Sequence, residues 1–168
     1  MISPRLLLAL LIFAPVPIAL AQSQPKAKAA KAATKAAAEN PPVVPPTLAN
    51  VRYGTHERHV LDFWRAASAT PAPLVFVIHG GGWQGGEKER VNKFVNVAGL
   101  LAQGISVVAI NYRFIKHAEA EGVTPPVKAP LHDAARALQF VRSQAAAWNL
   151  DKTRIGAAGG SAGACSSL

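Results

Sequence analysis

The hydrophobic positions of this chain gather in three nearly continuous apolar runs. Leu74–Ile78 precedes a glycine-rich stretch, Ile105–Ile110 precedes "NYRF", and Arg154–Gly159 leads into a serine flanked by small residues. Short apolar runs without alternating polar positions are typical of strands that are buried on both faces of a sheet. We therefore predict buried strands at Leu74–Ile78 and Ile105–Ile110 and a third apolar strand at Arg154–Gly159.

Apolar residues recur at helical spacing between the first two runs. The spacing predicts one helix from Val91 to Leu101, and Gly104 suits the position just after a helix end. The segment Ile115–Lys128, which contains two adjacent prolines, is predicted to be a long loop.

A second helix is predicted to open at Pro130. Asp133 would lie in its first turn, where a carboxylate suits the helix dipole, and we expect Asp133 and His132 to act as capping residues. A third helix should follow Ser161. The predicted buried stripe of the second helix comprises Leu131, Ala134, Ala135, Leu138, Val141, Ala145 and Trp148.

Two shorter segments ahead of these runs alternate in the manner of strands. Val51–Tyr53 and Val60–Trp64 flank "GTHER", which predicts an antiparallel pair joined by a turn. The later alternation of strands and helices predicts parallel strands joined by right-handed crossovers. The predicted fold class is therefore α/β, a mostly parallel sheet with flanking helices.

The first residues have the pattern of a secretory signal. Arg5 precedes an apolar stretch from Leu6, and Ala19–Leu20–Ala21 forms an A-x-A cleavage site. The apolar stretch is shorter than the roughly 20 residues of a membrane-spanning helix. We predict a signal peptide at 1–21 and an exported protein, periplasmic or extracellular. An uncleaved membrane anchor is the alternative.

Residues 22–47 are predicted to be a disordered linker. "QPKAKAAKAATKAAAEN" holds four lysines and no large apolar residue, so it has no face to bury in a core. The basic linker could contact an anionic envelope weakly, and a solvated tether is the simpler interpretation. The domain is then expected at 48–168.

Charge and cysteine content exclude several classes of protein. The net charge is +9, but residues 51–168 carry 13 Lys and Arg against 8 Asp and Glu, scattered rather than clustered, and no nucleic-acid motif is present. Cys165 is the sole cysteine, so neither a disulfide nor a zinc site with cysteine ligands is expected. A dinucleotide fingerprint is also missing after the first apolar run. We predict no cofactor and no metal.

The serine after the third apolar run lies in a G-x-S-x-G motif, Gly159–Gly163. A tight strand-to-helix turn forces such a serine into a strained conformation that exposes its Oγ, and the flanking glycines leave room for it. This pattern predicts that Ser161 is a nucleophile.

A second motif, "HGGGW" at His79–Trp83, follows the first apolar run. Acyl transfer places negative charge on a carbonyl oxygen, which backbone N–H groups can stabilise when no side chain intervenes. Gly81 and Gly82 can supply two such groups and Ala162 a third. The two motifs together favour a hydrolase over a cofactor-binding domain.

These motifs resemble those of α/β-hydrolases of the esterase and lipase group that carry an HGGG oxyanion loop. "HGGGWQGGEK", "VVAINYRF" and "DKTRIGAAGGSAG" are most similar to the bifunctional feruloyl and acetyl-xylan esterases. The resemblance implies that residues 51–168 are the N-terminal part of that fold. It also implies that Ser161 is the nucleophile, that Gly81, Gly82 and Ala162 are oxyanion donors, and that His79, with Gly80, organises the loop. The substrate would be a small-molecule or polysaccharide-linked ester.

Other polar residues have simpler interpretations. Trp83 could line the acyl pocket or merely cover the loop, whereas Tyr112 and Arg113 are expected to brace the end of the sheet. The remaining histidines, His56, His59 and His117, are expected in turns or loops as exposed polar residues.

No residue after Ser161 can serve as the acid or the histidine of a triad, which in this fold follow the serine. We therefore expect a C-terminally truncated, inactive fragment whose sheet is incomplete. The alternatives are a non-catalytic binding module on a hydrolase fold, or another serine hydrolase such as a formamidase or peptidase.

Overall fold

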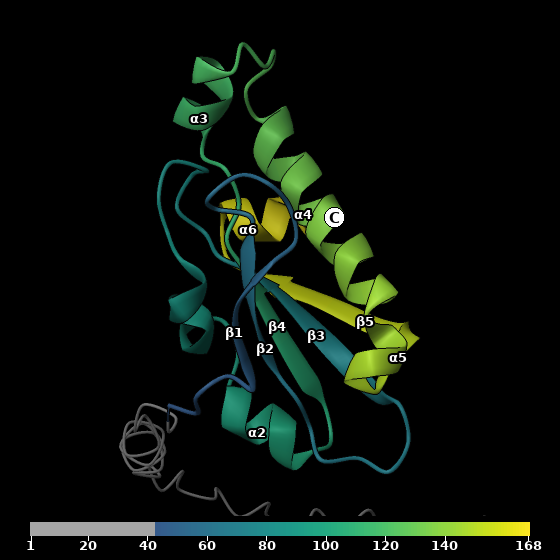
Figure 1. Ribbon diagram of the computed structural model, residues 1–168. Coiled ribbons are helices and arrows are strands. Elements are labelled where there is room, and N and C mark those ends of the chain that lie inside the picture. The colour runs from purple at the N-terminus through teal and green to yellow at the C-terminus, as the bar shows by residue number, and fades with distance from the viewer. Residues whose placement is uncertain (1–42) are drawn as a thin grey trace, which may run out of the picture. The chain divides into compact units, whose positions relative to one another are not determined.

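The computed structural model describes residues 43–168, and Figure 1 shows their elements. Five strands form one sheet in the order β1-β2-β4-β3-β5. β3 pairs in parallel with β4 and β5, while β2 is antiparallel to both β1 and β4. The strand bounds are β1 Leu48–Arg52, β2 Val60–Trp64, β3 Ala72–Ile78, β4 Ser106–Ile110 and β5 Leu150–Gly159. The predicted mostly parallel α/β sheet is confirmed.

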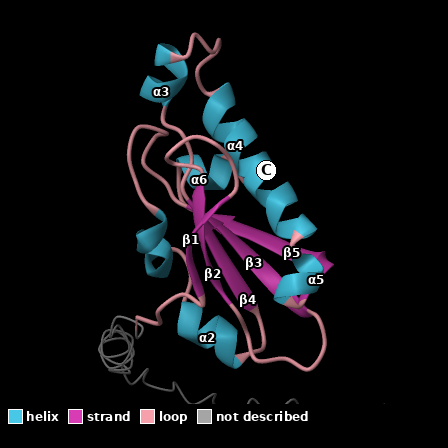
Figure 2. Cartoon of the chain, viewed as in Figure 1, coloured by secondary structure: helices cyan, strands magenta, loops and turns pink. Residues whose placement is uncertain are grey.

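Helices cover both faces of the sheet (Figure 2). On one face, α4 (Lys128–Ser143) and α5 (Ala145–Trp148) pack against a core that includes Phe63 and Phe76. On the other, the 3₁₀ helix η1 (Lys88–Lys93) and α2 (Val97–Ala102) pack against residues such as Val107. Across residues 43–168, no helix combines the length and apolarity needed to cross a bilayer.

The prediction of one continuous helix from Val91 to Leu101 is wrong, because the chain forms two helices there, η1 and α2. Asn96 separates the two in an extended conformation, and its side chain accepts a hydrogen bond from the Gly99 N–H. An asparagine that caps a new helix in this way ends the preceding one. Gly104, with φ of 74°, follows the end of α2 as predicted.

The long loop predicted at Ile115–Lys128 contains a further helix, α3 (Ile115–Ala120). In addition, α4 starts at Lys128, because Pro130 needs no N–H partner in a first turn and can sit inside it. Asp133 is consequently beyond the first turn and fully buried, so the capping role predicted for it is wrong.

The predicted stripe of α4 is also wrong in part. Ala134 and Val141 are buried, but Leu131 is 38% exposed and Ala135 is exposed. Both line a hollow of about 420 Å³ together with residues of α6 (Ala162–Cys165) and the last residues of the chain. The buried residues of α4 include Ala129, Pro130 and Asp133, which the predicted stripe lacks.

The described chain begins inside the predicted linker, at Val43. Val44 O accepts a hydrogen bond from Trp64 Nε1 at 2.8 Å, and Thr47 Oγ1 accepts one from the Arg65 N–H at 2.9 Å. Contacts with the domain therefore start a few residues ahead of position 48. The predicted signal peptide and the rest of the linker lie outside the described residues.

Candidate active site

Three polar or glycine-rich segments begin where β3, β4 and β5 end. His79 follows β3, Asn111 follows β4, and Gly160 and Ser161 follow β5. The three strands are parallel, so these segments meet at one edge of the sheet, where ligands bind in open α/β folds. This is the edge on which the sequence predicts the site.

Ser161 occupies a strained turn between β5 and α6. Its φ of 52° and ψ of −122° lie in a region that residues with a side chain rarely adopt, and its side chain is exposed. The strain predicted from the motif is thus present. Gly163 makes the turn possible, because a Cβ there would lie 2.1 Å from Ile78 O on β3.

The glycine-rich loop after β3 approaches this turn closely. A Cβ on Gly80 would lie 2.4 Å from Gly160 O and 3.6 Å from Ser161 Cβ, so only glycine allows the contact. Gly81, Gly82 and Trp83 all have positive φ values, of 122°, 60° and 55°. The loop turns back on itself through hydrogen bonds from the Gln84 and Gly85 N–H groups to Gly81 O.

The three predicted oxyanion donors have free N–H groups within the described part of the chain. The N–H groups of Gly81, Gly82 and Ala162 donate no hydrogen bond to any residue in 43–168. Unpaired backbone donors near an exposed serine are the arrangement that stabilises an oxyanion.

His79 lies inside the loop. Its side chain is 2% exposed, its Nδ1 donates to Gly80 O at 2.9 Å, and its ring stacks on Tyr112 at 4.2 Å between centroids. The Tyr112 hydroxyl donates to His79 O at 2.8 Å. Burial lowers the pKa of His79 and raises the pKa of Tyr112 to about 12, so both are neutral near pH 7.

Arg58 joins the loop to the end of β4, a contact that the sequence did not suggest. Its Nε donates to Tyr112 O at 2.7 Å and its Nη2 to Gly86 O at 2.9 Å, while the guanidinium lies 3.8 Å from the centroid of the Phe114 ring. The residue lies in a polar turn, where no local pattern distinguishes it from a solvated arginine.

Asp133 is the centre of a buried charge network rather than a helix cap. Arg113 binds it through its backbone N–H, Nε and Nη2, and His59 Nε2 lies 2.9 Å from its Oδ1. Burial alone would raise the pKa of Asp133, but the hydrogen bonds from His59 and Arg113 outweigh it and hold the pKa well below its usual value. Arg113 thereby braces the end of β4, as predicted. His59, predicted to be exposed, is 4% exposed.

Replacing Asp133 with asparagine is expected to reduce the free energy of unfolding by about 3 kcal/mol at pH 7, because Arg113 and the buried His59 lose the carboxylate between them. The carboxylate has a depressed folded-state pKa, so its contribution is present above the unfolded pKa near 3.9 and is lost as the pH falls below it. Urea titrations at pH 7 and pH 3 measure both effects.

Asp151→Asn is the matched control for that experiment. Asp151 binds Thr153 and Arg154 at an exposed position, so its replacement should change stability much less. Equal losses for the two variants would contradict a structural role for the buried network.

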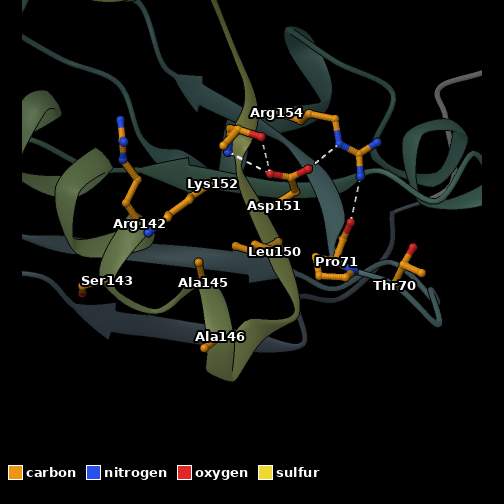
Figure 3. A pocket seen from close by; sticks show the side chains of 11 residues that line it. Thr70, Pro71, Arg142, Ser143, Ala145, Ala146, Leu150, Asp151, Lys152 and Arg154 are labelled. Carbon is orange, nitrogen blue, oxygen red and sulfur yellow. Dashed lines mark hydrogen bonds and ion pairs between the residues drawn. The ribbon is translucent and has the colours of Figure 1, made fainter.

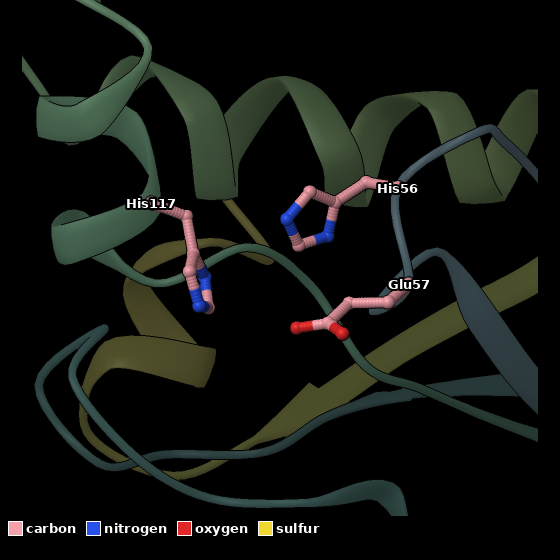
Figure 4. Close-up of side chains that lie close together, drawn as sticks. All are labelled: His56, Glu57 and His117. Atoms are coloured by element: carbon pink, nitrogen blue, oxygen red, sulfur yellow. The ribbon is translucent and has the colours of Figure 1, made fainter.

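His56, Glu57 and His117 face one another at the same edge of the sheet, with one ligand atom from each within 4.8 Å of the others (Figure 4). Each histidine Nδ1 accepts a backbone N–H, from Arg58 and Phe114 respectively. A neutral ring held in this way carries its proton on Nε2. It therefore offers a donor, which suits the Glu57 carboxylate better than a metal ion.

A hollow of about 560 Å³ lies at the opposite end of β5 (Figure 3). Asp151 and Arg154 on its wall bind each other, and Arg154 also donates to Pro71 O. Because β5 begins here and Ser161 follows its other end, this hollow is remote from the candidate site.

The BD-FAE family profile matches residues 61–168, well over half of the chain. Comparison with the curated proteins gave no match. The match begins in β2 and extends through the glycine-rich loop and the serine turn.

Solved structures of esterases share the fold. A truncated form of a carbohydrate esterase from gut microbiota is 29% identical with a TM-score of 0.61, and the alignment covers 77% of this chain and 45% of that one. An acetyl ester-xyloside bifunctional hydrolase from Caldicellulosiruptor lactoaceticus is 31% identical with a TM-score of 0.51, and the alignment covers 64% of this chain and 36% of that one. Esterase 2 of Thermogutta terrifontis is 25% identical with a TM-score of 0.60, and the alignment covers 77% of this chain and 47% of that one.

This chain therefore spans less than half the length of each of these three proteins. The residues matched by the family profile contain the glycine-rich loop and the turn at Ser161. From the match and the fold together, the chain belongs to the BD-FAE family of α/β-hydrolase-like esterases.

Proposed function

We propose that this protein is an exported serine hydrolase of carboxylic esters. The observation that carries the proposal is Ser161 itself: an exposed serine held at φ 52° between β5 and α6, with Gly80 of the glycine-rich loop against it. A side chain is kept in such a strained conformation when the surrounding fold over-determines it, and these positions cluster at active sites.

In the proposed reaction, Ser161 Oγ attacks the ester carbonyl carbon and its proton passes to a histidine. The negative charge on the carbonyl oxygen is stabilised by the N–H groups of Gly81, Gly82 and Ala162. The alcohol leaves with the proton from the histidine, and an acyl-serine remains. Water then releases the carboxylic acid and regenerates Ser161.

The histidine and the acid that orients it are proposed to lie outside residues 43–168. Within that range, Ser161 Oγ makes no hydrogen bond to a histidine, His79 is engaged with Gly80 O, and His59 with Asp133. The esterases compared above are more than twice as long as the portion they share with this chain. On this proposal, the 168-residue chain alone is inactive.

The substrate is proposed to be an acyl group carried by a polysaccharide. Two of the compared structures support this choice, since one is described as a carbohydrate esterase and the other as an acetyl ester-xyloside hydrolase. The predicted signal peptide at 1–21 agrees with a polymeric substrate, because a polysaccharide is met outside the cell.

Three substrates should distinguish the candidate reactions. The full gene product is the longer chain that would contain the proposed histidine and acid. We expect it to hydrolyse p-nitrophenyl acetate and methyl ferulate and to leave an N-formyl amide intact, since the proposed site is an esterase site. Absorbance assays measure each rate. The 168-residue chain and its Ser161→Ala variant serve as controls, and both should match the buffer rate.

Preferred turnover of the N-formyl substrate would replace the proposal with a formamidase. Inactivity of the full product toward every ester would instead favour a non-catalytic binding module. Serine-dependent turnover by the 168-residue chain would show that the base lies within it.

A further inference from the structure

The proposed oxyanion donors come from two separate segments. Gly81 and Gly82 belong to the loop after β3, whereas Ala162 begins α6 after β5. Donors from two segments act on one oxygen only if the segments keep a fixed distance and orientation. The contact between Gly80 and Gly160 fixes one point between them.

A second contact joins the two segments at the end of α6. Trp83 Nε1 donates to Ser166 Oγ at 3.1 Å, and Ser166 Oγ donates to Ala162 O at 2.9 Å. A chain of two hydrogen bonds thus runs from the residue next to Gly82 to the residue that carries the third donor. Ser166 directly follows α6, so the chain also anchors the end of that helix.

The indole is held in place from its own side. Trp83 packs against the core cluster that contains Phe114 and Ile78, and Trp83 O accepts a hydrogen bond from the Ile115 N–H at 2.9 Å. The Trp83 indole N–H is therefore a donor in a fixed position. The segment that ends at Ser166 must adopt the position in which Ser166 Oγ accepts from it.

We propose that Trp83 and Ser166 form a latch that sets the spacing between the two halves of the oxyanion hole. Both are positioning residues, since neither touches the reacting atoms. This role rests on the proposed function, but the latch itself can be tested without it. The packing of Gly163 on β3 and the contact of Gly80 with Gly160 join the two segments at the serine turn, and the latch joins them again at the end of α6.

The structural test uses ¹H–¹⁵N spectra of the 168-residue chain. Its three tryptophans give three indole N–H signals, and Trp83→Phe identifies the signal of Trp83. We expect Ser166→Ala to shift that signal and those of the Gly82 and Ala162 amides, and Ser166→Thr to retain them. Ser167→Ala is the matched control, because Ser167 Oγ donates to Ala164 O and makes no hydrogen bond to a tryptophan of the described chain.

The functional test uses the full gene product and p-nitrophenyl acetate. Ser166→Ala should lower kcat about tenfold and change KM by less than about twofold, because only the charged intermediate depends on the alignment of the donors. Ser166→Thr should restore kcat, Ser167→Ala should leave it unchanged, and Trp83→Phe combined with Ser166→Ala should cost no more than either alone.

Unchanged Trp83 and Gly82 signals in Ser166→Ala would overturn the latch. Shifted signals with an unchanged kcat would overturn its positioning role. A Ser161→Ala variant that keeps the parental rate would instead refute the proposed function, and the spectra would still test the latch.

Discussion

Replacing Ser161 with alanine in the full gene product is expected to lower kcat for ester hydrolysis by about 10⁴-fold to 10⁶-fold. The reason is that the acyl-serine can no longer form, and what remains is the contribution of the oxyanion donors and of binding. Initial rates with p-nitrophenyl acetate measure the loss. Ser167→Ala is the control and should retain the parental rate, because the half-buried Ser167 donates its hydroxyl only to Ala164 O.

Ser161→Gly provides a second readout of the same site. Glycine adopts a φ of 52° without strain, so this variant should be as inactive as Ser161→Ala but more stable than the parent by about 1 kcal/mol. Urea denaturation measures the difference. A glycine variant less stable than the parent would contradict the claim that strain is stored at this residue.

Replacing Gly163 with alanine is expected to cost about 3 kcal/mol of folding free energy. The added Cβ would lie 2.1 Å from Ile78 O and 2.8 Å from His79 O, so α6 must move away from β3. The displacement carries Ser161 with it, and activity should fall along with stability. Thermal and urea unfolding measure the first effect.

Gly156→Ala is the matched control, because Gly156 lies on the same strand-turn-helix unit but has no atom within 4 Å of its potential Cβ. Its effect should be below about 0.5 kcal/mol. If Gly163→Ala were equally mild, the close packing of the serine turn on β3 would not be what holds Ser161 in place.

Local patterns located β3, β4 and the turn at Ser161, but β1 begins at Leu48 rather than Val51 and β5 begins at Leu150 rather than Arg154. The apolar runs at Leu74–Ile78 and Ile105–Ile110 became β3 and β4 almost unchanged, because strands buried on both faces leave no polar position in their sequence. The G-x-S-x-G motif indicated the strained serine, since the small flanking residues are needed only where backbones meet.

The contacts missed by sequence analysis all depend on residues distant along the chain. Asp133 looks like a capping residue at the start of a helix, and its partners, Arg113 and His59, lie 20 and more positions away. Arg58 lies in a polar turn of the sequence, and its role depends on Tyr112 O after β4 and on Gly86 O, which only the fold places beside it. Long-range burial decides the role of such residues, and no local periodicity reports it.

The helix predicted from Val91 to Leu101 is divided by a capping residue that is visible in the sequence. Asn96 is followed three residues later by Gly99, whose N–H it caps. The apolar periodicity runs through the break because η1 and α2 cover the same face of the sheet. Periodicity reports the buried face, whereas capping residues report where each helix begins.

Covalent labelling of the full gene product tests the central claim most directly. A fluorophosphonate reacts with an activated serine and stays bound, so intact mass followed by peptide mapping identifies the nucleophile. We predict one adduct per chain, located on Ser161 and missing from Ser161→Ala. An adduct on another residue, or ester hydrolysis that continues at the parental rate without any adduct on Ser161, would contradict it.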